Sequence, residues 1–263
     1  MTWNPQLYLR FGDERSQPFF DLVHRLPAVE GAVRRVVDLG SGPGQLTATL
    51  CDRFPDAEVV GVDSSVEMVA AAEAAEHAER YGARLRFVLD DAATHTPPAP
   101  VDVLVSNATF QWIDDHVALL ERWLGLVRPG GVFAFQVPGN FGSASHRSFA
   151  ELVTGPRWRS RLDPAVLDRP RSVEPEVYLE RLLALGAAAQ VWETTYLHVL
   201  PGEDPVLQWI RATALRPVLA ALDPADVAVF ESELAERLRA AYPPGPHGTV
   251  FPFRRIFAVA VRP

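Results

Sequence analysis

The chain has 263 residues, of which 48% are hydrophobic and 22% charged, as is typical of a globular protein with one large core, and this excludes a disordered or collagen-like chain. All 25 cationic side chains are arginines, and with 33 carboxylates they give a formal net charge of -8, which argues against a general nucleic-acid-binding protein. The absence of lysine has two explanations, a coding bias towards arginine or a need for bidentate recognition of carboxylates, and composition favours the first.

The cysteine content and the N-terminal residues indicate the cellular compartment of the protein. Cys51 is the only cysteine, which excludes an intramolecular disulfide and a cysteine-based metal cluster, and no metal site is expected. The N-terminus carries charge and proline where a signal peptide would have an apolar run, and no stretch approaches the ~18 apolar residues of a membrane span. We expect a cytoplasmic protein without membrane contact.

The first elements expected along the chain are two helices. Asn4 and Pro5 are typical of a helix start. Trp3 and Tyr8 have the spacing of a hydrophobic staple, although the same residues could instead close over a bound ligand as a lid. A second helix is expected at about 16–26.

Strands and helices then alternate up to residue 137. A β-branched run ends at Gly40, and four further strands are expected at 58–63, 84–89, 101–106 and 132–137. The helices between them are expected at 45–54, 66–81 and 114–127. Ser64 and Glu67 have the spacing of a capping box for the second of these helices, and Gly82 ends it. Such alternation implies βαβ crossovers and a mostly parallel sheet with helices on both faces.

The pattern changes after Pro138. A loop at 139–146 precedes an arginine-rich, weakly periodic segment at 149–167. The later elements are a helix at 174–185, a strand at 187–200, helices at 204–221 and 224–241, and a last strand at 250–262. We therefore expect one α/β domain over residues 1–263, with a mostly parallel seven-stranded sheet and an inserted helical cap contributed by about 141–172 and 200–247.

The strongest motif is VVDLGSGPGQLT, in which a strand ends in Gly40, Gly42 and Gly44 and a helix follows. Alternate glycines bring bare backbone and a helix N-terminus against a ligand. Asp63 ends the next strand and lies 23 residues after Gly40. This separation is close to the roughly 20 residues expected for a carboxylate that accepts both ribose hydroxyls. Together these features predict an adenosine-type ligand at the carboxyl edge of the sheet.

The glycine spacing discriminates between adenosine ligands. The nicotinamide pattern G-x-G-x-x-G would need a third glycine at position 45, where Gln45 stands. The pattern G-x-G-x-G with Asp38 before it resembles motif I of class I S-adenosylmethionine-dependent methyltransferases. That resemblance implies their Rossmann-like fold and S-adenosylmethionine as cofactor, with Asp38 near its ammonium and sulfonium groups. Alternatively, Asp38 only bonds the backbone at the strand end.

Two further segments resemble motifs of the same family. RFVLDDAAT, at 86–94, resembles the adenine-binding motif, which implies that Asp91 accepts from the exocyclic amine and that Ala92 offers its N–H. Asp90 is the competing assignment, and either aspartate could be a mere turn residue. VDVLVSNATFQWIDDH, at 101–116, resembles the segment whose polar end lies beside the methyl group. His116 is interpreted as a surface or capping histidine.

The resemblance thus assigns two sets of residues. Those near the methyl group are Asn107, Gln111 and Trp112, of which Trp112 could equally serve packing. The cofactor-binding residues are Asp38, Gly40, Gly42, Gly44, Asp63, Ser64, Asp91, Ala92 and Ser106.

Beyond these motifs, the whole chain resembles the trans-aconitate methyltransferases within that superfamily. The specific segments are TTYLHVLP and WIRATALRPVL, and with WNPxxYxxF, SNATFQWIDDH, FQVPGN and FPFRRIFAVAVR they extend from Trp3 to Arg262. The resemblance implies methyl transfer to a carboxylate oxygen of trans-aconitate, a small anionic tricarboxylate. No catalytic base is expected, because a carboxylate with a pKa near ~4 is already ionised at neutral pH.

A tricarboxylate requires cations at its other carboxylates, and the planar guanidinium of arginine matches a carboxylate. Tyr196 and His198 alternate on one face of their strand. Arg254 and Arg255 are consecutive strand residues, so only one of them can face the cleft. The predicted substrate-binding residues are Tyr196, His198, Arg216 and Arg254. Arg211 is more typical of a solvated surface residue, and Pro217 is expected to end the helix that carries Arg216.

Three other functions remain open from the sequence. The chain could methylate another small acceptor, or bind an adenosine cofactor without turnover. A nucleotide-dependent oxidoreductase is the third alternative, disfavoured by Gln45. Because the cap can cover the cleft within one chain, we expect a monomer.

Overall fold

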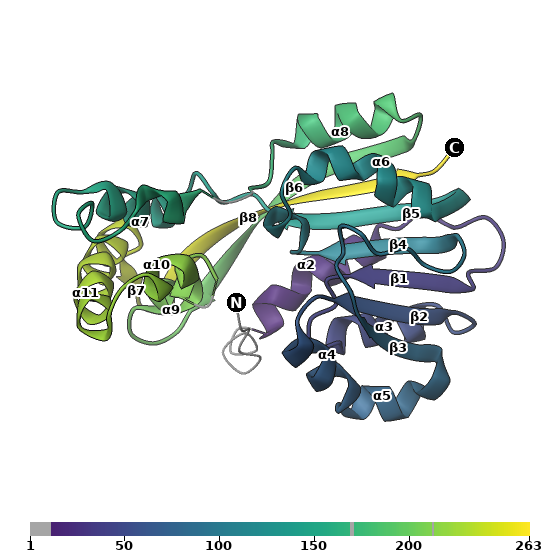
Figure 1. Cartoon of the computed structure of the whole chain (residues 1–263), viewed down its shortest axis with the longest axis horizontal. Helices are drawn as coiled ribbons and strands as arrows, with labels where there is room; N and C mark the ends of the chain where they lie inside the picture. Colours follow the sequence, from purple (N-terminus) through teal and green to yellow (C-terminus); the bar gives the residue numbers. More distant parts are fainter. Residues whose placement is uncertain (1–11, 169–170, 212) are drawn as a thin grey trace. The chain divides into compact units, whose positions relative to one another are not determined.

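A computed structural model describes residues 12–168, 171–211 and 213–263 (Figure 1). The expected helix that starts at Asn4, with Trp3 and Tyr8, lies outside the described residues. The described chain divides into two compact units. The first contains the residues up to Val137, Ser172–Glu193 and Ile256–Pro263, and the second contains Pro138–Arg171 and Thr194–Arg255. Each unit is described by itself below.

The first unit is built on parallel strands. Its strands are β1 (Arg35–Leu39), β2 (Glu58–Asp63), β3 (Leu85–Leu89), β4 (Val101–Asn107) and β5 (Val127–Pro138). β1 pairs in parallel with β2 and β4, β2 with β3, and β4 with β5. Since β1 lies between β2 and β4, the order reverses there, and ligands of open α/β sheets bind outside the carboxyl ends of the strands at such a point.

Two long strands complete the sheet and pass from one unit into the other. They are β6 (Ala188–Leu200) and β8 (Gly248–Val261), and the two-residue strand β7 (Pro244–Gly245) pairs antiparallel with β8. The order is β3-β2-β1-β4-β5-β8-β6. The predicted seven-stranded, mostly parallel sheet is confirmed, with β7 as an addition.

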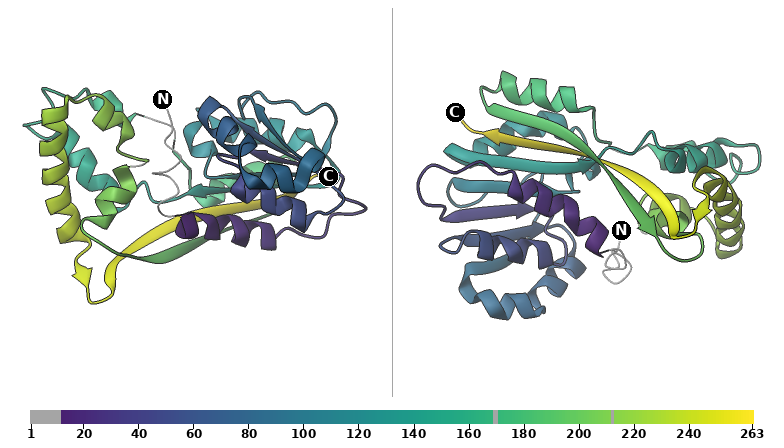
Figure 2. Two further views of the ribbon diagram at one scale, coloured as in Figure 1. Left: turned by 90° about the horizontal axis from the view of Figure 1, so that it is seen from below. Right: turned by 180° about the vertical axis from the view of Figure 1, so that it is seen from behind.

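Helices cover both faces of the first unit's sheet, as predicted. These helices are α2 (Gly12–His24), α3 (Gln45–Arg53), α4 (Val66–Glu73), α5 (Glu76–Tyr81), α6 (His116–Leu126) and α8 (Pro175–Ala184). α6 and α8 lie side by side, and α2 lies on the opposite face (Figures 1 and 2).

The helix expected at 66–81 differs from the prediction in two ways. It is interrupted after Glu73, and Ala75 has the extended backbone from which α5 starts. The capping residue is Ser65, not Ser64, because the hydroxyl of Ser65 accepts the Met68 N–H at 3.3 Å and donates to Glu67. Gly82 ends α5 as expected.

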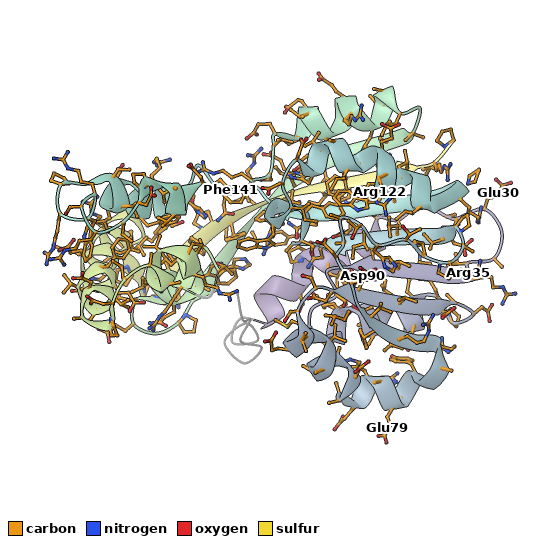
Figure 3. All side chains as sticks on the ribbon, viewed as in Figure 1. Glu30, Arg35, Glu79, Asp90, Arg122 and Phe141 are labelled. Atoms are coloured by element: carbon orange, nitrogen blue, oxygen red, sulfur yellow. The ribbon has the colours of Figure 1, made fainter. Side chains whose placement is uncertain are left out.

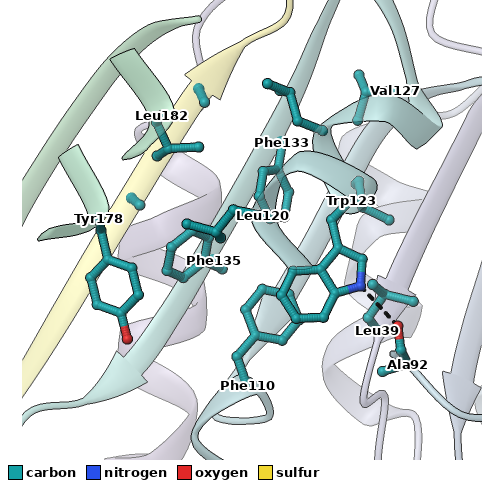
Figure 4. Packing of buried hydrophobic residues seen from close by; sticks show 14 of the residues in the cluster. Leu39, Ala92, Phe110, Leu120, Trp123, Val127, Phe133, Phe135, Tyr178 and Leu182 are labelled. Carbon is teal, nitrogen blue, oxygen red and sulfur yellow. Dashed lines mark hydrogen bonds between the residues drawn. The ribbon is translucent and has the colours of Figure 1, made fainter. Parts of the chain in front are cut away.

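An aromatic cluster holds the first unit together beneath its site (Figure 4). Phe110 stacks on Trp123 with ring centroids 3.8 Å apart, and Phe133 and Phe135 pack beside them. Tyr178 of α8 meets Phe135 edge-on at 5.2 Å. The short turn η2 (Phe110–Trp112) is therefore anchored in the core by its first residue.

The second unit contains the helices expected in the cap. They are α7 (Ala144–Thr154), α9 (Pro205–Arg211), α10 (Arg216–Ala220) and α11 (Pro224–Ala241). The helix expected at 204–221 is thus two helices, and Pro217 lies in the first turn of α10. The expectation that Pro217 ends a helix is wrong, because a proline needs no N–H partner in a first turn and is favoured there.

Ion pairs account for the many arginines of the segment at 149–167. Arg157 and Arg161 each pair with a carboxylate of α11, and the Trp158 indole N–H donates to Glu233 Oε2 at 2.8 Å. These contacts hold the segment without a long helix, which accounts for its weak periodicity. Within the described residues, no helix is long and apolar enough to cross a membrane.

Candidate cofactor and acceptor sites

The glycine loop between β1 and α3 depends on the absence of side chains. A Cβ at Gly40, where φ is 81°, would lie 1.9 Å from Thr109 Oγ1, and a Cβ at Gly44, where φ is 83°, would lie 2.5 Å from the Phe87 ring. A Cβ at Gly42 would meet nothing within 4 Å. Gly40 and Gly44 are therefore required by packing, whereas Gly42 presents open backbone at which a ligand can lie.

Asp63, at the end of β2, shapes the same loop. Its Oδ2 accepts the Gly42 N–H at 2.8 Å and its Oδ1 accepts the Ser65 N–H at 2.9 Å. Each carboxylate oxygen has further acceptor capacity, and the side chain is only partly buried. Asp63 can thus hold the loop and still accept two hydroxyls. The neighbouring Ser64 is exposed.

Asp38 is a buried carboxyl group under the loop, with 3% of its surface exposed. Its Oδ2 accepts from the Thr47 hydroxyl at 2.6 Å, while its Oδ1 has no hydrogen-bond partner among the described residues. Burial raises the pKa of Asp38 to about 7, against the effect of the Thr47 hydrogen bond and with a contribution from the charge of Asp63. An unpaired, buried carboxylate is costly unless a cation joins it.

Two more acceptor oxygens lie at the carboxyl end of β4. Asn107 Oδ1 and Gln111 Oε1 are both buried and lack a partner in the described part of the chain. β1 and β4 pair in register, with Asp38 opposite Val105, so Asn107 lies at the same sheet edge as Asp38. A set of acceptors without donors suits a cationic ligand.

The loop after β3 is held in place from α6. The Trp123 indole N–H donates to the Ala92 carbonyl at 2.8 Å (Figure 4). The guanidinium of Arg122, a residue labelled in Figure 3, donates to the Ala93 and His95 carbonyls. Asp90 pairs with His95 Nδ1 at 2.8 Å, and this hydrogen bond lowers its pKa. Because Asp90 is engaged in this way, the geometry favours Asp91 over it for the adenine.

Asp91 itself is exposed, although its Oδ1 also accepts the Ala93 N–H at 2.8 Å. Ser106 is buried, and its hydroxyl donates to the Leu39 carbonyl at 2.7 Å, tying β4 to β1. The predicted cofactor contact of Ser106 therefore has no support from its side chain. Sequence reasoning missed Thr109, which lies in the 101–116 motif but was given no role there, and Arg122, which lies in no motif; both act through residues distant in the sequence.

In the second unit, Tyr196 and His198 share one face of β6 as predicted. Their rings stack with centroids 6.0 Å apart, and His198 also stacks on Trp209 at 5.1 Å. Burial lowers the pKa of His198 to about 4, and the nearby charge of Arg255 adds to this effect. His198 is therefore a neutral imidazole at physiological pH.

The two consecutive arginines of β8 take different positions, as the alternation rule requires. Arg255 is 5% exposed, lies over the Phe253 ring at 4.4 Å and acts on His198, whereas Arg254 donates to the Gly139 carbonyl at 3.4 Å. Arg255 is therefore the arginine of this pair whose charge acts on His198, and the acceptor contact of Arg254 stays a prediction. Alternation predicts opposite faces but not which residue takes which face.

The remaining arginines of the predicted acceptor site lie on helices. Arg216 begins α10 and is half-buried, and desolvation lowers the pKa of its guanidinium. Arg211 pairs with Glu231 at 2.8 Å on the surface, in line with the prediction that it is a surface residue.

Comparison with known proteins decides the family. Residues 36–131 match the family described as methyltransferase domain. The chain is 50% identical over 259 residues to the trans-aconitate 2-methyltransferase of Streptomyces avermitilis, covering 98% of this chain and 96% of that protein. It is 47% identical to the enzyme of the same name from Mycolicibacterium gilvum, covering 98% of each. This chain belongs to the trans-aconitate 2-methyltransferase family.

Solved structures agree with the class I methyltransferase fold of this family. The YcgJ protein from Bacillus subtilis superposes with a TM-score of 0.60 at 15% identity, covering 94% of this chain and 98% of that one. Phosphoethanolamine N-methyltransferase 2 from Haemonchus contortus, in complex with S-adenosylmethionine, gives 0.57 at 20% identity, covering 94% and 52%. At these identities the likeness shows the fold.

The protein is accordingly an S-adenosylmethionine-dependent methyltransferase, and its first unit fits that cofactor. The cofactor carries a sulfonium and an ammonium group, and the unpartnered acceptors of Asp38, Asn107 and Gln111 suit positive charge. Gly42 offers open backbone, and Asp63 offers acceptors for the ribose.

The titration of Asp38 predicts a pH-dependent cofactor affinity. A cation binds the carboxylate form, and the pKa of about 7 means that a proton must leave below that pH. We expect calorimetric affinity to fall as the pH drops below 7, approaching about tenfold per unit. Asp38→Asn should bind more weakly at pH 7.5 and show a flat profile.

The free Asp38→Asn protein should be at least as stable as the wild type at that pH. The reason is that the pKa of Asp38 is raised by burial. As the pH rises through 7, the buried carboxyl loses its proton, and the buried charge lowers the free energy of unfolding. A wild-type affinity that does not change with pH would contradict the assignment of Asp38.

Proposed function

We propose that this protein transfers the methyl group of S-adenosylmethionine to a carboxylate oxygen of trans-aconitate. The observation that carries the proposal is the similarity to proteins named trans-aconitate 2-methyltransferase, at 50% identity over 98% of the chain. That similarity includes the whole second unit, in which the predicted acceptor residues lie. A match confined to the generic glycine loop would support the cofactor alone.

The chemistry needs positioning more than proton transfer. When bound, the cofactor supplies a methyl group whose C–S bond breaks as the C–O bond forms, so that the sulfonium and carboxylate charges disappear together. The acceptor carboxylate, with a pKa near ~4, is ionised without help from a base. The neutral His198 has no role as a base in this scheme and can instead hydrogen-bond a carboxylate oxygen. The residues of the chain therefore bind, orient and exclude water.

For the acceptor, we propose Tyr196, His198, Arg216 and Arg254 as binding residues. The stacked pair on β6 and the half-buried guanidinium of Arg216 support the first three. A partly desolvated guanidinium favours an anion more strongly than a surface one does. We also propose that the protein acts as a monomer in the cytoplasm and without nucleic acid, in keeping with its net charge of -8.

Arg216→Ala is expected to raise the KM for the acceptor by roughly tenfold to a hundredfold, since one charged hydrogen bond is worth ~1.5–3 kcal/mol. Cofactor affinity should be unchanged. Arg216→Lys should recover only part of the loss, because an ammonium does not reproduce the planar fork. Arg211→Ala, which removes a paired surface arginine, is the matched control and should leave KM unchanged. Full recovery by lysine would contradict bidentate binding.

The proposal is tested by incubation with methyl-labelled cofactor and a panel of acids: trans-aconitate, cis-aconitate, citrate and a saturated tricarboxylate. Label in trans-aconitate at the highest kcat/KM supports it. A higher kcat/KM for another acid of the panel would instead support a different acceptor. Tight cofactor binding without transfer to any acceptor would point to a binding protein.

A further inference from the structure

The turn between β4 and α6 carries Gln111 and Trp112. At its N-terminal end, Ala108 has an unusual backbone conformation. Ala108 has φ of 55°, in the left-handed region that residues other than glycine rarely adopt. Its N–H donates to the Gln136 carbonyl at 2.8 Å, and its own carbonyl accepts from Gln111 Nε2 at 2.5 Å. A non-glycine residue persists in this region when its surroundings over-determine it, which is common at functional sites.

The other end of the turn is held by a buried pair, His116 and Tyr178. His116 Nε2 lies 2.8 Å from Tyr178 Oη, and the two side chains are 3% and 0% exposed. This corrects the interpretation of His116 as a surface residue. Tyr178 lies on α8, far along the chain, so no local pattern could reveal the contact.

The directions of these hydrogen bonds follow from what each atom can donate. Tyr178 Oη accepts the Val173 N–H at 3.2 Å, which leaves the phenolic hydrogen for His116 Nε2. Burial lowers the pKa of His116, which favours the neutral ring, and the backbone of Ile113 acts on that pKa in the opposite direction. The chain of bonds therefore runs from Val173 through Tyr178 to His116, which begins α6 directly after the turn, and the backbone of Ile113, where the turn ends, also acts on His116.

Packing alone does not require these polar atoms. Tyr178 lies in an apolar cluster with Phe135 and Leu182, in which a phenylalanine could fill nearly the same space. Burying a hydroxyl and an imidazole there is unfavourable unless both are fully hydrogen-bonded. A fully satisfied network of this kind selects one arrangement of the segments that it joins.

We propose that His116 and Tyr178 are positioning residues for methyl transfer, and that their hydrogen bonds fix the turn that carries Gln111 and Trp112. The inference rests on the proposed function, because the family resemblance behind it implies that Gln111 and Trp112 lie near the methyl group. It assigns to α8 a part in catalysis that none of the sequence motifs indicates.

Tyr178→Phe tests the proposal, since it removes the hydroxyl and retains the ring. We expect kcat to fall roughly tenfold, with a smaller rise in cofactor Kd, because Gln111 is only one of the acceptors that suit the cofactor and Asp38, Asp63 and the glycine loop are unchanged. In the free protein, backbone hydrogen exchange should become faster at 109–113 and stay unchanged in β1 to β3. Tyr81→Phe is the matched control, because it removes a hydroxyl that is hydrogen-bonded to Asp52, away from the turn. It should change neither kcat nor the exchange rates at 109–113.

His116 supplies a second variant should Tyr178→Phe fold poorly. His116→Gln retains an acceptor and a donor, and should recover part of the rate lost in His116→Phe. Unchanged kcat in folded Tyr178→Phe, or equal rates in the two His116 variants, would overturn the proposal. Exchange is measured without acceptor or cofactor. If the wild type does not methylate trans-aconitate, the proposed function fails, and the exchange rates at 109–113 still decide whether the network holds the turn.

Discussion

Gly40→Ala is expected to abolish cofactor binding and to lower the stability of the protein markedly. An alanine in the left-handed region costs ~1–2 kcal/mol. The new Cβ would also lie 1.9 Å from Thr109 Oγ1, so the loop or the turn must shift, and such overpacking costs a further ~1–3 kcal/mol. The melting temperature should fall by on the order of 10 °C. Calorimetry with S-adenosylmethionine and a thermal melt measure both effects.

Gly31→Ala separates backbone strain from the clash. Gly31 has a positive φ of 80°, nearly that of Gly40, but a Cβ there meets nothing within 4 Å. It should lose only the ~1–2 kcal/mol of strain and bind the cofactor normally. If the two variants were equally stable and bound the cofactor equally well, the close contact between Gly40 and Thr109 would have no importance for the site.

Asp63→Asn is the second substitution with a large expected effect, and cofactor Kd should rise by at least about a hundredfold. Two hydrogen bonds from ribose hydroxyls to a carboxylate are worth ~1.5–3 kcal/mol each. In addition, Asp63 accepts from the Gly42 and Ser65 N–H groups, and an amide would set its own NH2 against one of these donors. The loop should therefore lose its shape as well as its ligand contacts.

Glu58→Gln is the control for a charge change on the same strand. Glu58 lies at the opposite end of β2 and pairs with Arg86 on the surface. Surface pairs of this kind contribute ~0–1 kcal/mol, so cofactor affinity should stay within about twofold. An Asp63→Asn variant that behaved like Glu58→Gln would remove Asp63 from the cofactor site.

The sheet of the first unit was predictable because its information is local. Buried parallel strands appear as continuous apolar runs, and glycine loops mark their carboxyl ends. The strand expected at 58–63 matches β2, and the one at 101–106 differs from β4 by one residue. The glycine loop and Asp63 followed from spacing, because one strand-loop-helix unit contains the loop and the next strand ends in the carboxylate.

Sequence-based predictions were wrong or incomplete where contacts with residues distant in the sequence determine the position of a side chain. His116 is buried because Tyr178 of α8 supplies its hydrogen bond. The arginine-rich segment depends on the carboxylates of α11, such as Glu233. For Arg254 and Arg255, the choice of face depends on the partners of β8, which periodicity does not contain. A similar limit applies to the unpartnered acceptor oxygens of the site, since burial and not residue type leaves them without a donor.

The most direct measurement is the identity of the product formed from 13C-methyl-labelled S-adenosylmethionine and trans-aconitate. The account predicts a singly methylated trans-aconitate whose label is an O-methyl ester, released as methanol by mild alkali, formed by the wild type and lost with Asp63→Asn. Trans-aconitate recovered without label, or label in a form that alkali does not release, would contradict carboxylate methylation by this protein.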